Sequence, residues 1–151
     1  MNVSGAFDMN SISIPYSEEG RENSSYEGEA IHTFFTDGSV YGNNSKIKVI
    51  KSDMRSLTDG YLMFYHNSTL ETFEGDLSSL TNGNRMFGHT KISSFEGDLS
   101  SLTNGDSMFT DCSNLTSFSS DLSSLTNGEY MFLNCSNLTT FTSDLSSLTN
   151  G

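Results

Sequence analysis

Large apolar residues recur with a fixed period from residue 47 to residue 151. Each repeat opens with an aliphatic residue, and further large apolar residues follow three, seven and ten positions later. The opening residues are Ile47, Leu70, Ile92, Leu115 and Leu138. They divide the chain into coils 1 to 5, which span 47–69, 70–91, 92–114, 115–137 and 138–151. A period of 22 or 23 residues is the sequence signature of a solenoid.

The polar residues between these columns repeat as well. The octapeptide Asp-Leu-Ser-Ser-Leu-Thr-Asn-Gly occurs at 76–83, 98–105, 121–128 and 144–151, and a looser copy opens at Asp53. We expect the aspartate to cap the following turn by accepting backbone N–H groups. We also expect the Asn-Gly or Asp-Gly step to form a turn that requires positive φ at glycine. Each Met-Phe pair after this turn should pack back on the strands.

These features predict an α/β repeat solenoid with one short parallel strand per coil and short helical or irregular return segments. The strand is the extended stretch from the opening aliphatic residue to the aspartate. Its opening aliphatic residue and Phe should point inward, and strands of adjacent coils should lie about 4.8 Å apart. Coil 2 is one residue short between Phe87 and Ile92, and we expect its return loop to absorb the difference.

The N-terminal part differs from the coils. Residues 1–29 form a polar leader, and residues 30–46 form a degenerate half-repeat before the repeats of 47–151. The run from Ser11 to Ile14 alternates like a strand, whereas Glu18 to Glu29 indicates a loop or a partly disordered segment. We expect the leader to dock on the first coil as an N-terminal cap. The alternative is that it is the end of a different structural unit. Residue 151 falls halfway through a repeat, which predicts a fragment of a longer array or, alternatively, a self-associating end.

Composition and charge narrow the classes of function. The chain has a formal net charge of −12, and no Lys or Arg follows Lys91. Nucleic acids and anionic membranes are therefore unsuitable partners, because phosphate binding needs clustered basic residues. No segment is apolar enough for membrane insertion, and no signal peptide is visible. No catalytic constellation stands out, so we predict a non-enzymatic protein without a cofactor.

The outward-facing strand positions are the candidate binding surface. They are acidic in the early coils and rich in hydroxyl groups in the later ones, and they include no aromatic residue. The candidate binding residues are Lys51, Thr72, Glu74, Asp76, Ser94, Glu96, Asp98, Ser117, Ser119, Asp121, Thr140 and Thr142. Because binding hot spots are enriched in Trp, Tyr and Arg, this face predicts polar recognition.

Three sets of residues that recur at equivalent positions in successive coils are candidates for metal binding or redox chemistry. In the favoured interpretation, each stacked aspartate caps a turn. In the alternative, the aspartates form a ladder of calcium ligands, since calcium takes clustered oxygen ligands. His66, His89 and Asp111 share a column that suits solvated side chains better than zinc. Cys112 and Cys135 lie 23 residues apart in one column, where we expect two buried free thiols.

The segments 108–115 and 131–138 both read Met-Phe-x-x-Cys-x-x-Leu. Together with the Leu-x-x-Phe-x-x-Asp-Leu-x-x-Leu pattern, they resemble the leucine-rich repeats of BspA-type bacterial surface proteins over residues 47–151. The first two coils depart from that family because they lack the cysteine. The resemblance implies a cell-surface or secreted binding protein, often an adhesin, and similar repeats occur in virion-borne proteins.

Two functions follow as hypotheses. The first is a binding or adhesion module that recognises a protein or a surface polymer. The alternative is a structural spacer, or an assembly or receptor-binding arm, of a cell-surface or phage protein. The uncovered coil at residue 151 adds end-to-end self-association as a further expectation.

Overall fold

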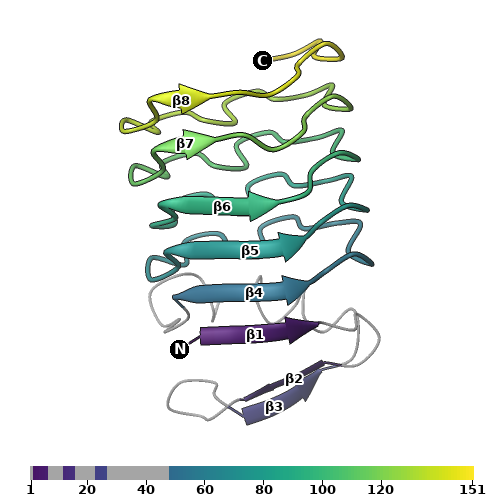
Figure 1. The fold of residues 1–151 in the computed structure, drawn as a ribbon, viewed down its shortest axis with the longest axis vertical. Helices are drawn as coiled ribbons and strands as arrows, with labels where there is room; N and C mark the ends of the chain where they lie inside the picture. The colour runs from purple at the N-terminus through teal and green to yellow at the C-terminus, as the bar shows by residue number, and fades with distance from the viewer. Residues whose placement is uncertain (1, 7–11, 16–22, 27–47) are drawn as a thin grey trace.

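The computed structural model describes residues 2–6, 12–15, 23–26 and 48–151, and side chains only within 48–50 and 54–151. Its strands are β1 (Asn2–Ala6), β2 (Ile12–Pro15), β3 (Asn23–Tyr26) and β4 (Val49–Asp53), followed by β5 (Thr72–Asp76), β6 (Ser94–Gly97), β7 (Ser117–Phe118) and β8 (Thr140–Phe141). These described residues form strands and turns and contain no helix. Each of β4 to β8 belongs to one coil, and the coils stack along the long axis of the molecule (Figure 1).

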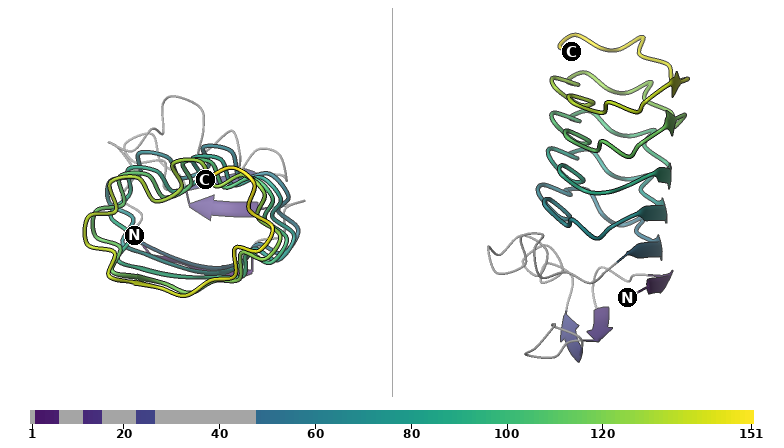
Figure 2. Two further views of the ribbon diagram at one scale, coloured as in Figure 1. Left: turned by 90° about the horizontal axis from the view of Figure 1, so that it is seen from above. Right: turned by 90° about the vertical axis from the view of Figure 1, so that its left-hand side faces the viewer.

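The strands of the coils are parallel and aligned column by column. Ile50 pairs with Phe73, and Phe73 pairs with Phe95. Viewed along the stack, successive coils follow nearly the same path (Figure 2). The strand pairing forms two groups, β1-β4-β5-β6 and β7-β8, rather than the single sheet that the repeat predicted. At the junction, the Ser120 hydroxyl donates to the Gly97 carbonyl at 2.8 Å, and the coils remain stacked.

The missing residue of coil 2 leaves the strands in register. The octapeptide columns and the strand columns of coils 2 and 3 are both 22 residues apart. The difference lies between His89 and Ile92, in the return segment, where coil 1 has one more residue. The prediction that the return loop absorbs the deletion is therefore confirmed.

The N-terminal strands extend the stack and add a hairpin. β1 pairs in parallel with β4, so the leader contributes an edge strand beside coil 1. β2 overlaps the alternating run of residues 11–14 and pairs antiparallel with β3. The expectation of a loop throughout 18–29 was wrong for β3, because Asn-Ser-Ser-Tyr has no alternating pattern and its pairing comes from β2. The half-repeat at 30–46 lies outside the described residues.

The apolar columns form one continuous core. The opening aliphatic residues and the strand phenylalanines of coils 2 to 4 are almost fully buried, as predicted, and so are the Met-Phe pairs of coils 1 to 3. Two ladders of stacked rings run through this core. They consist of Phe64, Phe87, Phe109 and Phe132 in the return segments and Phe73, Phe95, Phe118 and Phe141 in the strands. Rings of the two ladders meet edge to face at 4.9–5.5 Å between centroids.

The glycine that ends each octapeptide does not serve the turn as predicted. Positive φ occurs instead two and six residues later, for example 56° at Arg85 and 58° at His89. Glycine allows close packing here: a Cβ on Gly60 would lie 2.6 Å from the sulfur of Met86 in the next coil, so the end of that methionine side chain would have to shift. The same contact would measure 2.8 Å between Gly83 and Met108. The sequence suggested a turn signal at a position where the structure instead packs the glycine against a methionine side chain of the next coil.

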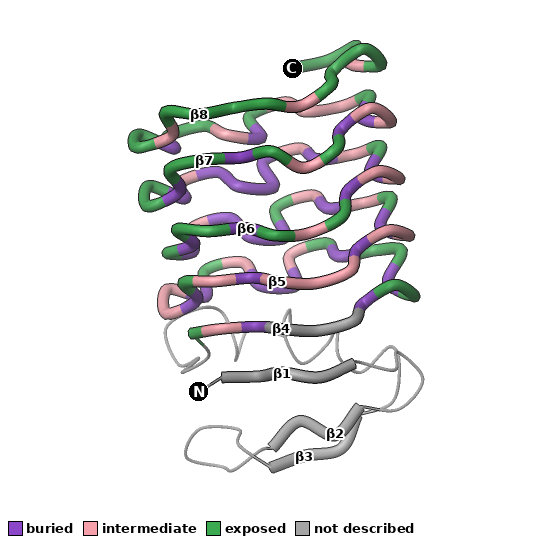
Figure 3. Tube along the Cα trace, viewed as in Figure 1, coloured by how far each residue is buried: buried purple, intermediate pink, exposed green. Residues whose placement is uncertain are grey.

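Burial decreases in coil 5. Phe141 and Leu145 are 39% and 36% exposed, whereas their counterparts in the inner coils are buried (Figure 3). The end-to-end self-association expected from the sequence stays a prediction.

Candidate binding surface

Most of the candidate binding residues lie on the outer face of the strands. Register places Thr72 beside Ser94, Glu74 beside Glu96, and Ser117 beside Thr140. The side chains in coil 2 are half-buried, whereas those of coils 3 to 5 are exposed. The backbone of Lys51 pairs with that of Glu74, but the Lys51 side chain lies outside the described side chains. The predicted change from acidic to hydroxyl-bearing residues therefore follows the long axis of the face.

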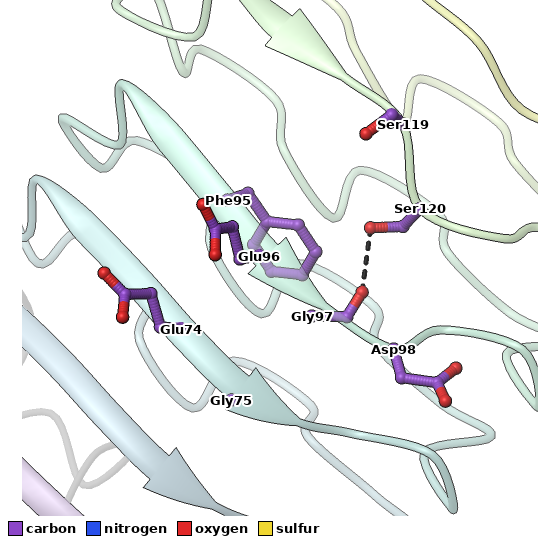
Figure 4. A pocket seen from close by; sticks show the side chains of 8 residues that line it. All are labelled: Glu74, Gly75, Phe95, Glu96, Gly97, Asp98, Ser119 and Ser120. Carbon is purple, nitrogen blue, oxygen red and sulfur yellow. Dashed lines mark hydrogen bonds between the residues drawn. The ribbon is translucent and has the colours of Figure 1, made fainter.

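A shallow, open hollow of about 480 Å³ lies on this face over β5, β6 and the segment after β7 (Figure 4). Five of its eight lining residues carry polar side chains, and the others are Phe95 and two glycines. The lining residues are Glu74, Gly75, Phe95, Glu96, Gly97, Asp98, Ser119 and Ser120. Sequence reasoning identified the acids and Ser119 but neither the hollow nor the contribution of Phe95.

The aspartate column caps turns, as predicted. One carboxylate oxygen of Asp76, Asp98, Asp121 and Asp144 accepts the backbone N–H two residues later at 2.8–2.9 Å. This hydrogen bond from Ser123 lowers the pKa of Asp121 below its ordinary value, because it stabilises the charged form. Within the described part of the chain, no group of three or more His, Cys, Asp or Glu is arranged to hold a metal ion.

Two polar ladders connect the coils next to this column. Asn104 donates its side-chain N–H to the amide oxygen of Asn82 at 3.1 Å, and Asn127 donates to Asn104 in the same way. The hydroxyl of Thr103 donates to the Thr81 carbonyl at 3.0 Å, and the pattern continues in the following coils. Sequence reasoning assigned the asparagines to the turn and missed both ladders. The signal was present, since an amide both donates and accepts, and asparagine recurs at this position in coils 2 to 5.

Comparison with known proteins gave no match: no family model, no curated protein and no solved structure matches the chain. Among the described residues, no helix long and apolar enough to cross a membrane was found.

The histidine column lies at the surface of the return segments, as predicted. The rings of His66 and His89 stack with centroids 4.2 Å apart and planes 4° from parallel. Tyr65 meets both rings edge-on, and His89 Nε2 lies 3.5 Å from Asp111 Oδ2. Parallel rings direct their nitrogen lone pairs side by side rather than toward one point, which disfavours a shared metal ion.

This stack predicts a loss of stability in mild acid. Desolvation, followed by the neighbouring His89, lowers the pKa of His66 below its ordinary value, while Asp111 acts in the opposite direction. The folded state then binds fewer protons than the unfolded state, so the contribution to stability is complete above the ordinary pKa and is lost as the pH falls from there through the lowered folded-state pKa. The midpoint of urea unfolding is measured at pH 7.5 and at pH 5.5. The decrease in this midpoint between the two pH values should be smaller for His66→Asn than for the wild type.

Asparagine is the matched replacement because Asn134 occupies the same column with φ of 60°, against 59° at His66. An equal fall for both proteins would show that the His66–His89 stack does not contribute to the acid sensitivity.

Cys112 and Cys135 are free and buried, as predicted. Each thiol donates to a carbonyl of the preceding coil at 3.1 Å, Cys112 to Phe87 and Cys135 to Phe109. Burial raises the pKa of Cys112 to about 11 and that of Cys135 to about 12. Both positions are therefore structural rather than reactive.

The thiols should consequently resist alkylation in the folded protein. Because the pKa is raised, the thiolate fraction at pH 8 is lower by about a hundredfold or more than that of an ordinary cysteine. Alkylation slows in proportion, because only the thiolate reacts. Iodoacetamide labelling, followed by mass spectrometry, should be slower by at least that factor without urea than with it. Comparable rates in the two conditions would mean that the column is open to solvent.

Proposed function

We propose that this chain is a non-enzymatic binding or adhesion module of the leucine-rich-repeat class, related to BspA-type surface proteins. Its ligand, a protein or a surface polymer, docks on the outer face of the strands. The observation that supports this proposal most is the position of the hollow. It lies where the strand face changes from Glu74 and Glu96 to Ser119, whereas the octapeptides of coils 2 to 5 are identical.

The chemistry of this face favours a polar or basic ligand. Glu96, Asp98, Ser119 and Thr142 are exposed on it, and the net charge of the chain is −12. Complementary charge speeds encounter and excludes acidic partners. This surface fits a cell-surface, secreted or virion-associated protein whose partner is neither a nucleic acid nor a membrane.

A structural spacer is the second candidate. The observation that favours it is the continuity of the asparagine and threonine ladders, which connect every coil from coil 1 to coil 5. Regular ladders make a stiff stack that extends with each added coil. In this role, no residue of the outer face has a dedicated ligand.

A binding survey separates the two candidates. The immobilised chain is presented with host matrix proteins, lysine-rich and acidic model proteins, and bacterial wall polymers. A binding module retains at least one of them specifically, and mutation of the outer face reduces that binding. A spacer retains none above the level of a scrambled-sequence control, and that result would refute the binding proposal.

A further inference from the structure

We propose that the Asn-Gly step of the octapeptide is a site of spontaneous deamidation, and that the coil stacked on each step shields it. Of the four Asn-Gly steps, the one at Asn150 reacts in the folded chain, whereas those at Asn82, Asn104 and Asn127 react only when the coils open. The inference concerns the joints between coils, so it is independent of the ligand proposed for the outer face.

Deamidation at this dipeptide needs no enzyme, only water and hydroxide. The glycine nitrogen loses its proton to hydroxide and attacks Cγ of the asparagine. A bond forms between that nitrogen and Cγ, the bond from Cγ to Nδ2 breaks, and the departing nitrogen takes up a proton and leaves as ammonia. Water then opens the resulting cyclic imide at one of its two carbonyls, which gives aspartate or isoaspartate. Glycine favours the attack because it has no Cβ to obstruct its nitrogen.

The glycine N–H that has to react is held by the next coil. Gly83 and Gly105 each donate to the backbone carbonyl of the asparagine one coil further on at 2.8 Å, and Gly128 does so at 2.7 Å. The coils follow nearly the same path, so these bonds line up along the stack (Figure 2). A hydrogen-bonded amide becomes reactive only after a local opening. The nucleophile of each inner step is therefore withheld while the coils stay stacked.

The asparagine side chain is fixed as well. The amide oxygen of Asn104 accepts from the side chain of Asn127 at 3.1 Å and from the backbone N–H of Asp106 at 3.2 Å. The amide nitrogen of Asn104 donates to Asn82 at 3.1 Å. The other two inner asparagines make the equivalent bonds. Cγ has to turn onto the following nitrogen to form the imide, and that rotation breaks the bonds of the ladder.

Asn150 has only part of this protection. Its amide nitrogen donates to Asn127 at 2.9 Å and to Glu129 at 3.3 Å. Its amide oxygen accepts no hydrogen bond from the part of the chain that the structure describes, and the Gly151 N–H donates none within it. The 151-residue chain thus contains an unshielded copy of the same octapeptide as an internal reference.

Deamidation of an inner step would alter the joint that it belongs to. Isoaspartate adds one atom to the main chain at a residue whose backbone pairs with both neighbouring coils. Either product also places a carboxylate in the amide ladder. The opened coil then does not close as before, so the reaction turns a transient opening into a permanent one.

The test follows deamidation of the 151-residue chain in mildly alkaline buffer, with and without urea. Phenylalanine lies between successive octapeptides, so cleavage there gives each Asn-Gly step its own peptide for mass spectrometry. Without urea, Asn82, Asn104 and Asn127 should react at least about tenfold more slowly than with it. Asn150 should react at a rate within about threefold of its rate in urea.

Asn127→Ala separates this shielding from general unfolding. It removes the bond that Asn127 donates to the oxygen of Asn104, and it should speed deamidation at Asn104 about fivefold. Asn82 keeps its own bonds and should keep its wild-type rate. Ser124→Ala changes the same octapeptide outside the ladder, so this matched control should alter neither rate.

Equal rates at Asn104 with and without urea would overturn the inference, and so would a rate at Asn150 as low as at the inner steps. An equal increase at Asn82 and Asn104 in Asn127→Ala would also overturn it, because the coils would then open together rather than shield each step. None of these results bears on the binding survey, which tests the proposed function separately.

Discussion

Replacement of Phe87 by alanine is expected to lower the free energy of unfolding by about 3–5 kcal/mol. Phe87 is fully buried, and its ring contacts both phenylalanine ladders. It stacks on Phe64 and Phe109 at 5.3 and 5.4 Å, and it meets Phe73 and Phe95 edge to face at 5.0 and 5.4 Å. Alanine leaves a cavity among four rings that belong to three coils, and the stacked backbone cannot close around it.

The matched control is Phe141→Ala. Phe141 belongs to the strand ladder and contacts two rings, but 39% of its surface is exposed. Its loss should amount to about 1 kcal/mol, because less area is removed from water on folding. Urea unfolding followed by circular dichroism measures both variants. Equal losses would show that the ladders do not form a continuous core.

The second large effect concerns the asparagine ladder. Asn104→Asp should cost about 1–3 kcal/mol at neutral pH, since it removes a donor and places a charged oxygen against an acceptor. The Asn104 side chain donates to Asn82 at 3.1 Å, and its oxygen accepts from Asn127 and from the backbone N–H of Asp106. Aspartate retains both accepted bonds and loses the donated one.

Asp59→Asn provides the control in the same column. Asp59 accepts from Asn82 and from the backbone N–H of Tyr61, both at 2.9 Å, and asparagine can accept in the same way. The free energy of unfolding should change by less than about 0.5 kcal/mol. A loss for Asp59→Asn as large as that for Asn104→Asp would contradict the donor-acceptor direction of the ladder.

The sequence predicted the parallel strands, the buried apolar columns and the aspartate caps, because each of these depends on residues of one coil at a fixed spacing. Positions that depend on the next coil were harder to predict. The glycine after Asn82 resembled a turn signal, but its partner is Met108, 25 residues away. The interruption of strand pairing between β6 and β7 was likewise not predicted from the repeat.

The candidate surface was predictable in part. Alternation along the strands identified Glu74, Glu96 and Ser119 as outward-facing residues, and the structure places all three around the hollow. Phe95 was assigned to the core, and the structure confirms its burial, with 8% of its surface exposed and its ring edge beside Gly97. A pattern of inward and outward positions identifies which residues face the core, but it does not show which buried residue borders a hollow.

The central claim is that ligands dock on the outer face of the strands. The most direct test compares two doubly substituted proteins that lose the same charge, using the strongest ligand from the binding survey. Glu74→Gln with Glu96→Gln alters the face, whereas Asp111→Asn with Glu129→Gln alters the return side. Surface plasmon resonance should show a Kd about tenfold weaker for the first protein and nearly unchanged for the second. Equal weakening, or a greater loss in the return-side protein, would contradict the claim.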